Sequence, residues 1–123
     1  MLLKQKRIYR ADLRANSNTL YLFGDNESRR GLGGQAKEMC GEPNAIGVRT
    51  KRKPSLKEAD FWTDETLAKN CQMIDEDLAP ARHHLAKGGT VVVPEDGLGT
   101  GLAQLEQRAP QTFAYLEQAI QAL

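Results

Sequence analysis

The stretch TVVVPEDGLGTG, residues 90–101, decides the class of fold that this sequence predicts. Its first half is apolar and β-branched without alternation, which is typical of a strand that is covered on both faces. Its second half is a glycine-rich loop, and polar loops that follow buried strands are typical of α/β domains. We therefore expect a sheet with helices on both faces.

Three further segments have the composition of strands. Residues 19–23 and 45–48 are apolar runs bounded by turn residues, and residues 6–9 form a shorter run near the start of the chain. Helical segments separate several of these strands along the chain. This alternation predicts an α/β fold with a single domain over residues 1–123, and it leaves the order of the strands open.

Three other segments predict helices. Residues 35–39 form a turn or two, a long helix begins at Thr63, and a last helix starts near Pro110. Pro80 leaves two alternatives within the long segment, either a kink or the start of a second short helix. Apolar residues at helical spacing predict the buried faces of these helices: Leu67, Cys71, Ile74, Leu78, Leu85, Phe113, Leu116, Ile120 and Leu123.

The composition argues against several classes of protein. The 123 residues include 17 Lys and Arg against 16 Asp and Glu, so the net charge is +1. This balance argues against strong general binding of nucleic acid, because no net positive field attracts phosphates. No apolar run approaches the ~20 residues of a membrane span, and the first residues do not have the pattern of a secretory signal. We expect a cytoplasmic protein with free thiols at Cys40 and Cys71 and no membrane partner, and the oligomeric state stays open.

Glycine-rich or basic loops follow three of the predicted strands. GDN at residues 24–26 and GLGG at residues 31–34 follow the first, RTKRK at residues 49–53 follows the second, and EDGLGTG at residues 95–101 follows the third. If the strands are parallel, these loops leave from one carboxyl edge, where open α/β sheets bind their ligands. Glycines let backbone N–H groups approach an anion closely, and a helix start adds a partial positive charge. The loops together predict a nucleotide or diphosphate site.

Other conspicuous residues have simpler interpretations. His83 and His84 are predicted to lie on the surface, and the acidic residues 75–77 to form the solvated face of a helix. Trp62 either stacks on a base or anchors the core. Residues 49–53, taken alone, would be a solvated loop. No cluster has the spacing of metal ligands, so we expect neither a metal ion nor another cofactor.

The loop motifs GDN, GLGGQA, TK and DGLGTGL resemble those of macrodomains. The likeness is greatest to the lysine-dependent ADP-ribosyl glycohydrolases, which include the terminal ADP-ribose protein glycohydrolase and the DNA-ADP-ribose hydrolases of toxin–antitoxin systems. It covers only the three loops of those enzymes. The chain is also similar over nearly its whole length to small uncharacterised bacterial and phage proteins with the same motifs. The resemblance implies a three-layer, macrodomain-like domain with a mostly parallel or mixed sheet that binds ADP-ribose.

The resemblance also implies a role for each loop. The first loop would face the distal ribose, the third would wrap the diphosphate, and Lys51 would be the catalytic lysine. The implied ligand-binding residues are Asn26, Gly31, Gly33, Gly34, Thr50, Gly97, Leu98, Gly99, Thr100 and Gly101.

One departure from the enzymes concerns the catalytic acid. The human-type enzyme keeps an aspartate just after the diphosphate loop, and the nearest positions in this chain are Gly101 and Ala103, so that acid is missing. Asp25, Asp96 or Glu95 could take its place, or the chain could bind without turnover.

These observations lead to two main functions from different classes and to a third hypothesis. The first is hydrolysis of the glycosidic bond at the distal ribose of an ADP-ribosyl conjugate, with Lys51 as nucleophile and Asp25 or Asp96 relaying the proton. The other cations of the second loop are expected to favour the neutral form of the lysine. The second function is non-catalytic binding of ADP-ribose or a related nucleotide signal. A third hypothesis is an unrelated nucleotide-binding enzyme that shares only the glycine loops.

Overall fold

A four-stranded parallel sheet forms the centre of the protein in the computed structural model, which describes residues 1–31 and 33–123. The strand order is β1-β4-β2-β3. The strands are β1 (Leu2–Gln5), β2 (Thr19–Asp25), β3 (Ala45–Arg49) and β4 (Thr90–Pro94).

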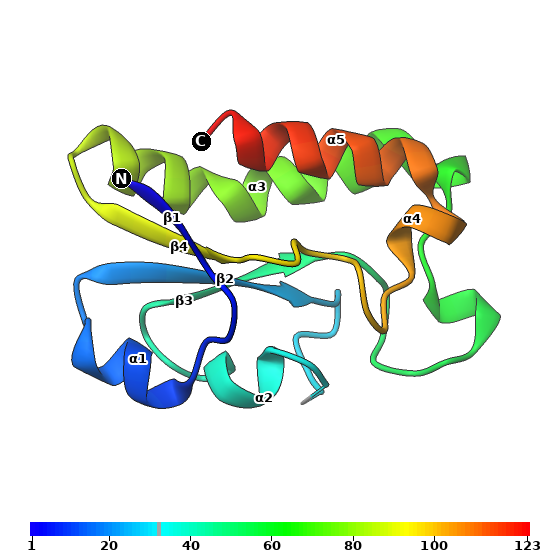
Figure 1. Cartoon of the computed structure of the whole chain (residues 1–123). Helices are drawn as coiled ribbons and strands as arrows, with labels where there is room; N and C mark the ends of the chain where they lie inside the picture. Colours follow the sequence, from blue (N-terminus) through cyan, green and yellow to red (C-terminus); the bar gives the residue numbers. More distant parts are fainter. Residues whose placement is uncertain (32) are drawn as a thin grey trace.

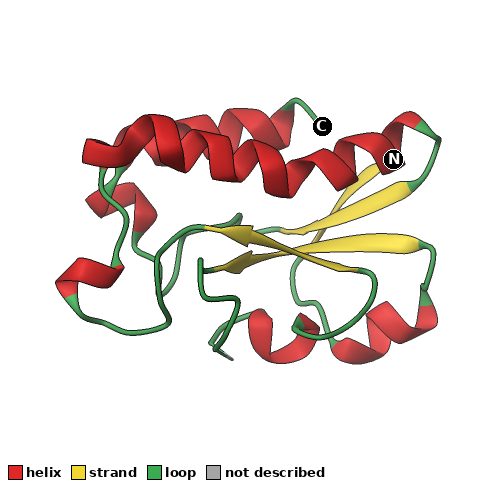
Figure 2. Cartoon of the chain, turned by 180° about the vertical axis from the view of Figure 1, so that it is seen from behind, coloured by secondary structure: helices red, strands yellow, loops and turns green. Residues whose placement is uncertain are grey.

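Helices cover both faces of the sheet. Figure 1 shows α1 (Arg10–Ala15) and α2 (Ala36–Met39) below the sheet, and α3 (Leu67–Ala86) and α5 (Pro110–Gln121) above it. The view from behind in Figure 2 shows the same three layers. The shorter elements are α4 (Leu105–Arg108) and the 3-10 helices η1 (Glu58–Asp60) and η2 (Asp64–Thr66). The predicted α/β class is therefore confirmed, with a sheet that is wholly parallel.

The core consists of two apolar layers, one on each face of the sheet. Alternate residues of β4 explain this, because Val92 faces the α1 and α2 side while Val91 and Val93 face the α3 and α5 side. All three valines are buried, as expected for a doubly covered strand. The fully buried side chains of the layer between the sheet and the helices α3 and α5 include Leu22, Val48, Ile74, Leu78, Leu105 and Leu116.

The first strand differs from the prediction. It comprises Leu2–Gln5 rather than residues 6–9, because Leu2–Gln5 pair with the β-branched run of β4. Ile8 is buried instead in the layer beneath the sheet, just before α1. The helix α1 itself was not predicted, because Leu13 is its single fully buried residue and leaves no helical pattern.

The long helix continues through its proline. α3 is one helix from Leu67 to Ala86 with Pro80 exposed inside it, which excludes the alternative of a second short helix. It is preceded by η2, whose N-cap Thr63 accepts a hydrogen bond from the Glu65 amide at 3.3 Å. In the described part of the chain, no helix combines the length and the apolar character needed to cross a membrane.

Asp64 ties the start of α5 to η2. Its carboxylate accepts hydrogen bonds from the backbone N–H of Gln111 at 2.9 Å and of Thr112 at 3.0 Å, and from the Thr112 hydroxyl at 2.9 Å. Although burial by itself raises the pKa of Asp64, the three hydrogen bonds together hold the pKa below its usual value. The ionised form is therefore the one that stabilises the fold.

Asp64→Ala is expected to lower the free energy of unfolding by about 1–2 kcal/mol at neutral pH, because it removes the cap of α5. Since the pKa of Asp64 is depressed by folding, its contribution is complete above the unfolded pKa. It is lost as the pH falls through the folded pKa. Urea denaturation should therefore show a gap between wild type and variant that closes at acidic pH. The exposed neighbour Glu65, changed to Ala, is the control, and an equal loss in both variants would contradict this role.

Candidate functional site

The loops after β2, β3 and β4 meet at one edge of the sheet, as parallel strands require. β2 and β4 are neighbours, and the segments that follow them lead to opposite faces, toward α2 and α5 (Figure 1). A Cβ atom on Gly24 would lie 3.7 Å from the backbone nitrogen of Gly99 and 3.9 Å from Oγ1 of Thr50. Residues from all three loops therefore lie within van der Waals distance at this edge, where α/β sheets bind ligands.

Asp25, a predicted catalytic acid, is engaged in contacts within the protein. Its carboxylate accepts a hydrogen bond from the backbone N–H of Asn26 at 2.9 Å and forms an ion pair with Nη1 of Arg29 at 3.1 Å. A side chain at Gly47 on the neighbouring strand would collide with this carboxylate. The contacts give Asp25 a defined role in shaping the first loop.

Asn26 is also turned into the protein. Its side chain is buried, donates to the carbonyl of Arg30 at 2.6 Å and accepts from the Ser28 amide at 3.0 Å. These bonds close the first loop on itself, which is a common use of asparagine in turns.

The glycines of the first loop lead toward the third. Gly33 and Gly34 are exposed and Gly31 is half-buried, while Leu32 lies outside the described residues. A Cβ atom on Gly33 would lie 2.7 Å from Cδ1 of Leu102, so this part of the first loop adjoins the end of the third. The following helix α2 has only four residues, so its dipole contributes less than the sequence led us to expect.

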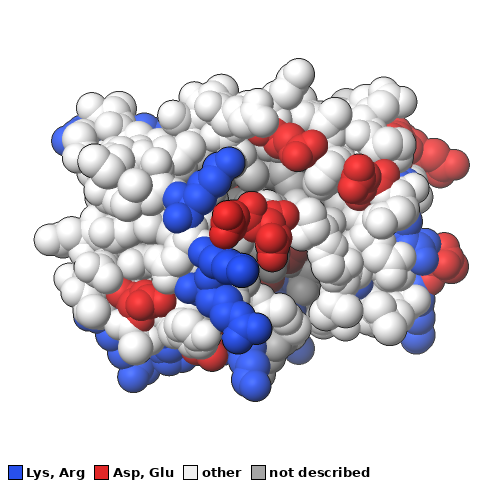
Figure 3. Space-filling view, viewed as in Figure 1, with Lys and Arg blue, Asp and Glu red and all other residues white. Residues whose placement is uncertain are grey.

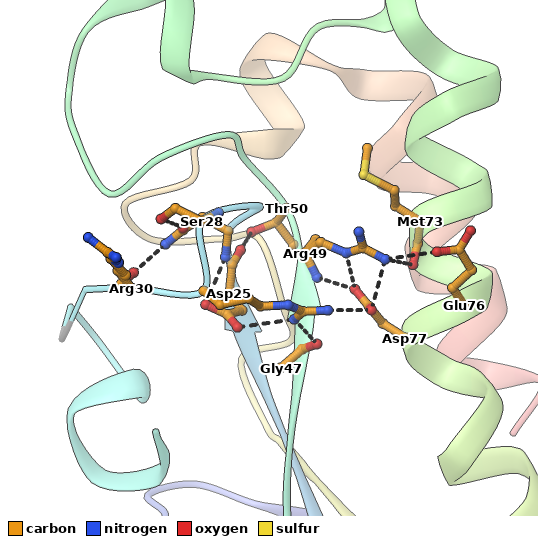
Figure 4. A network of polar contacts seen from close by, with 11 residues as sticks. Asp25, Ser28, Arg30, Gly47, Arg49, Thr50, Met73, Glu76 and Asp77 are labelled. Carbon is orange, nitrogen blue, oxygen red and sulfur yellow. Dashed lines mark hydrogen bonds and ion pairs between the residues drawn. The ribbon is translucent and has the colours of Figure 1, made fainter. Parts of the chain in front are cut away.

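A buried carboxylate holds the first two loops against α3 (Figure 4). Asp77 accepts hydrogen bonds from the backbone nitrogen of Arg49 at 2.8 Å, from its Nε at 2.9 Å and from Nη2 of Arg29 at 2.7 Å. The hydrogen bonds that Arg49 donates to Asp77, together with the negative charge of Asp77, raise the pKa of Arg49. The prediction of a solvated acidic face was wrong for Asp77, because two guanidinium groups stabilise its buried charge. We call Asp25, Arg29, Arg49 and Asp77 the Asp77 clamp.

Lys51, the second residue after β3, is buried. Its Nζ lies over the ring of Phe61, 4.2 Å from the ring centroid, and donates a hydrogen bond to the Ser55 carbonyl at 2.6 Å. Thr50 is buried beside it and donates from Oγ1 to the Asp25 carbonyl at 3.1 Å. The prediction that residues 49–53 form a solvated loop therefore holds only for the exposed residues 52 and 53.

The environment of Lys51 favours its neutral form. Burial lowers the pKa of the amine, the charge of Asp60 opposes this effect, and the positive charge of Arg108 adds to it. The cation that acts on Lys51 thus comes from α4 rather than from its sequence neighbours, and Arg49 is turned toward Asp77 instead.

Arg108 and Asp60 were not singled out from the sequence. Arg108 has its Cζ 3.8 Å from the Phe61 centroid and forms an ion pair with Glu58 at 2.6 Å. Asp60 accepts a hydrogen bond from the hydroxyl of Ser55, whose carbonyl receives the Lys51 amine. The contacts of Arg108 join segments that are far apart in the chain, so no local spacing could have identified them, whereas the bond between Ser55 and Asp60 spans only five residues.

The third loop combines buried and exposed residues. Leu98 and Gly99 are buried, and Gly99 has φ of +76° with Leu105 Cδ2 only 2.9 Å from where its Cβ would be. A side chain at Gly99 would therefore disturb the fold itself. By contrast, Thr100 and Gly101 are exposed, and a Cβ atom on Gly101 would meet nothing within 4 Å.

Two cavities border these loops. One, of about 470 Å³, lies between the first loop, the residues after β3 and the start of α3. We call it the basic cleft, and its lining includes the exposed residues Glu27, Ser28, Arg52, Lys53 and Lys69 and the buried residues Trp62, Asn70 and Met73.

The other cavity, of about 150 Å³, lies between β1, β4 and α5 and includes Asp96, Gly97, Leu98 and Thr100. Figure 3 shows Lys and Arg side chains running beside Asp and Glu side chains on the face that carries β1. Of the residues predicted as one site, Asp96, Gly97, Leu98 and Thr100 line this smaller cavity, whereas none lines the basic cleft and Lys51 lines neither. Among the described residues, no group of three or more His, Cys, Asp or Glu could hold a metal ion.

The fold and these loops define a three-layer α/β domain whose polar residues gather at the carboxyl edge of a parallel sheet. Residues 3–119 match a protein family described as a family of unknown function (DUF7831). The chain belongs to this family. The searches with this chain found no matching curated protein and no matching solved structure.

Proposed function

We propose that this protein is macrodomain-like, binds ADP-ribose or an ADP-ribosyl conjugate at the carboxyl edge of the sheet, and hydrolyses the bond to the distal ribose. The observation that carries the proposal is Lys51, a buried amine with a lowered pKa two residues after the end of β3. The likeness of the loop motifs to macrodomain hydrolases supports the choice of ligand.

The third loop supports binding of a diphosphate. Gly97, Thr100 and Gly101 are exposed, and glycine lets a phosphate approach the backbone N–H groups without hindrance from a side chain. Gly24 and Thr50 lie next to this loop at the edge of the sheet. A ligand held there would extend from the third loop toward the first.

The lysine supports a covalent mechanism. As the bond from the anomeric carbon to the acceptor breaks, the acceptor leaves with a proton and the neutral amine of Lys51 bonds to that carbon. The attached nitrogen then loses both of its protons, the bond from the anomeric carbon to the ring oxygen breaks as that oxygen gains one proton, and an open-chain ribose joined to Lys51 through an imine results. Water then hydrolyses the imine, which releases ADP-ribose and regenerates the amine. The Ser55 carbonyl accepts one N–H of Lys51 at 2.6 Å and so helps to orient the amine.

Asp60 is the carboxylate best suited to replace the missing aspartate. Its charge acts on Lys51, and it accepts a hydrogen bond from the hydroxyl of Ser55, next to the carbonyl that receives the amine. Asp25 is instead paired with Arg29, and Asp96 borders the cavity beside α5. The proton relay is therefore assigned to Asp60 rather than to Asp25 or Asp96, which the sequence analysis expected to relay the proton.

Non-catalytic binding is the second candidate function. It is favoured by the exposed Gly101 and the half-buried Ala103, the positions nearest to the aspartate that the human-type enzyme keeps after its diphosphate loop. A chain without that acid would hold ADP-ribose as a reader or sponge. Turnover of ADP-ribosylated protein or DNA by the wild type decides between the two functions.

ADP-ribose at a hundred times its dissociation constant is expected to raise the free energy of unfolding by about 2.7 kcal/mol. Gly101→Val should fold normally, because the position is open, yet weaken this stabilisation by obstructing the backbone of the third loop. Thermal unfolding with and without ligand measures both effects. Ala114→Val, at an exposed position of α5, is the control. Absence of any shift at millimolar ADP-ribose would overturn the proposed ligand.

A further inference from the structure

The basic cleft lies apart from the proposed ADP-ribose site. Its lining residues come from the segments after β2 and β3 and from the start of α3, and none comes from the third loop. β3 is an edge strand, so the cleft is on the outer side of the sheet, whereas β2 and β4 meet in its interior. The two backbones beside the cleft are joined by hydrogen bonds from Glu27 N to Lys51 O at 2.9 Å and from Ser28 N to Arg52 O at 3.2 Å.

Three cations face this cleft without a carboxylate partner. Arg52, Lys53 and Lys69 line it, and within residues 1–31 and 33–123 no carboxylate oxygen lies within 4.0 Å of their charged nitrogens. The single acidic residue of the lining, Glu27, accepts a hydrogen bond from the indole N–H of Trp62 at 3.0 Å. The cleft therefore carries a net positive charge in a chain whose total charge is only +1.

The buried part of the cleft is apolar and held in place. Trp62 and Met73 are buried there. Asn70 beside them donates to the Thr63 carbonyl and to the Thr112 hydroxyl, both at 3.0 Å, and accepts from Thr66 at 3.0 Å. Its side chain thus bonds to three residues in two segments of the chain, η2 with its N-cap and α5, which fixes the inner wall. A preformed hollow of this kind suits a ligand that has both a charged and an apolar part.

We propose that the basic cleft is a second binding site, for a small phosphorylated molecule that also carries an aromatic or other apolar group. The phosphate would lie among Arg52, Lys53 and Lys69, since these cations have no other charge to neutralise. The apolar group would contact Trp62 and Met73. This inference stands independently of the proposed hydrolase function.

Phenyl phosphate and inorganic phosphate are suitable probes, because they share the charge and differ in the apolar group. Trp62 is the sole tryptophan of the chain and lines the cleft, so its fluorescence reports on ligand binding there. Phenyl phosphate is expected to change the emission of Trp62 and to bind at least several-fold more tightly than inorganic phosphate. An equal affinity would contradict the contribution of the apolar wall, and unchanged emission with no binding by calorimetry would overturn the site.

Charge variants test the position of the phosphate. Lys69→Glu and Lys53→Glu, both at exposed positions, should each raise the dissociation constant of phenyl phosphate at least tenfold. Lys87→Glu is the matched control: it makes the same change just after α3, about 27 Å along the helix from Lys69 and beyond the screening length of ~10 Å. An equal loss in Lys87→Glu would reduce the effect to general charge attraction and overturn the proposal.

Glu27→Gln gives a prediction of the opposite sign. The amide oxygen of glutamine can still accept the hydrogen bond from Trp62, while the negative charge at the rim is removed. The dissociation constant of phenyl phosphate should therefore fall several-fold, and no change or a rise would contradict the proposed place of the phosphate. Gly101→Val should leave it unaltered, which separates this site from the ADP-ribose site. Binding of a single-stranded oligonucleotide but of neither small probe would overturn the small-molecule assignment.

Discussion

Lys51→Ala is expected to reduce turnover of an ADP-ribosylated substrate by about a thousandfold or more, because it removes the nucleophile. The dissociation constant of ADP-ribose should change by no more than about fivefold, since the third loop is proposed to supply most of the contacts to the diphosphate. Single-turnover kinetics and calorimetry measure the two quantities. Lys57→Ala, at an exposed lysine of the segment that encloses Lys51, is the control and should keep full activity.

Two further variants of Lys51 separate chemistry from packing. Lys51→Met retains a long apolar side chain over Phe61 and should fold like the wild type while losing turnover. Lys51→Arg should also be inactive, because a guanidinium stays protonated and does not attack. Borohydride added during turnover should trap a covalent adduct on the wild type and on neither variant. Full activity in Lys51→Ala would end the hydrolase hypothesis.

The lowered pKa of Lys51 sets the expected pH dependence of the reaction. Burial disfavours the ammonium form, so the neutral amine is reached at a lower pH than for a lysine in water. The rate should therefore rise with pH and level off below the usual pKa of lysine. In Arg108→Gln, which removes the nearby positive charge, the rise should move to higher pH.

Asp77→Ala is expected to lower the free energy of unfolding by about 3 kcal/mol or more, the largest stability effect that we predict. The variant leaves the guanidinium of Arg49 largely buried without its main carboxylate partner, and it also releases Arg29 from α3. Arg29 is 44% exposed and regains contact with water, which keeps the loss near the lower end of the range for buried pairs.

The neighbouring acid provides the comparison for Asp77. Glu76 is exposed and pairs with Arg49 at 3.1 Å, so Glu76→Ala should cost no more than about 0.5–1 kcal/mol. Urea denaturation of both variants at moderate salt concentration measures the difference. Similar losses in the two would show that the Asp77 clamp behaves as an ordinary surface ion pair.

Local patterns were sufficient to predict most of the elements. The runs at residues 19–23, 45–48 and 90–94 are strands, and the helical spacing from Leu67 onward corresponds to α3. These predictions succeed because the spacing of apolar residues within a segment reflects which of its faces packs against the core, and that spacing can be read from the segment alone. The three loops lie together at the carboxyl edge because β2, β3 and β4 all pair in parallel.

Tertiary structure alone decided the strand order β1-β4-β2-β3, the burial of Asp77 and the approach of Arg108 to Lys51. Each of these joins residues that are far apart in the sequence, such as Arg29 with Asp77 or Phe61 with Arg108. A charged residue has the same sequence signature on a solvated helix as in a buried pair. The difference lies in whether folding brings an opposite charge close enough to offset desolvation, and that distance is a property of the assembled structure.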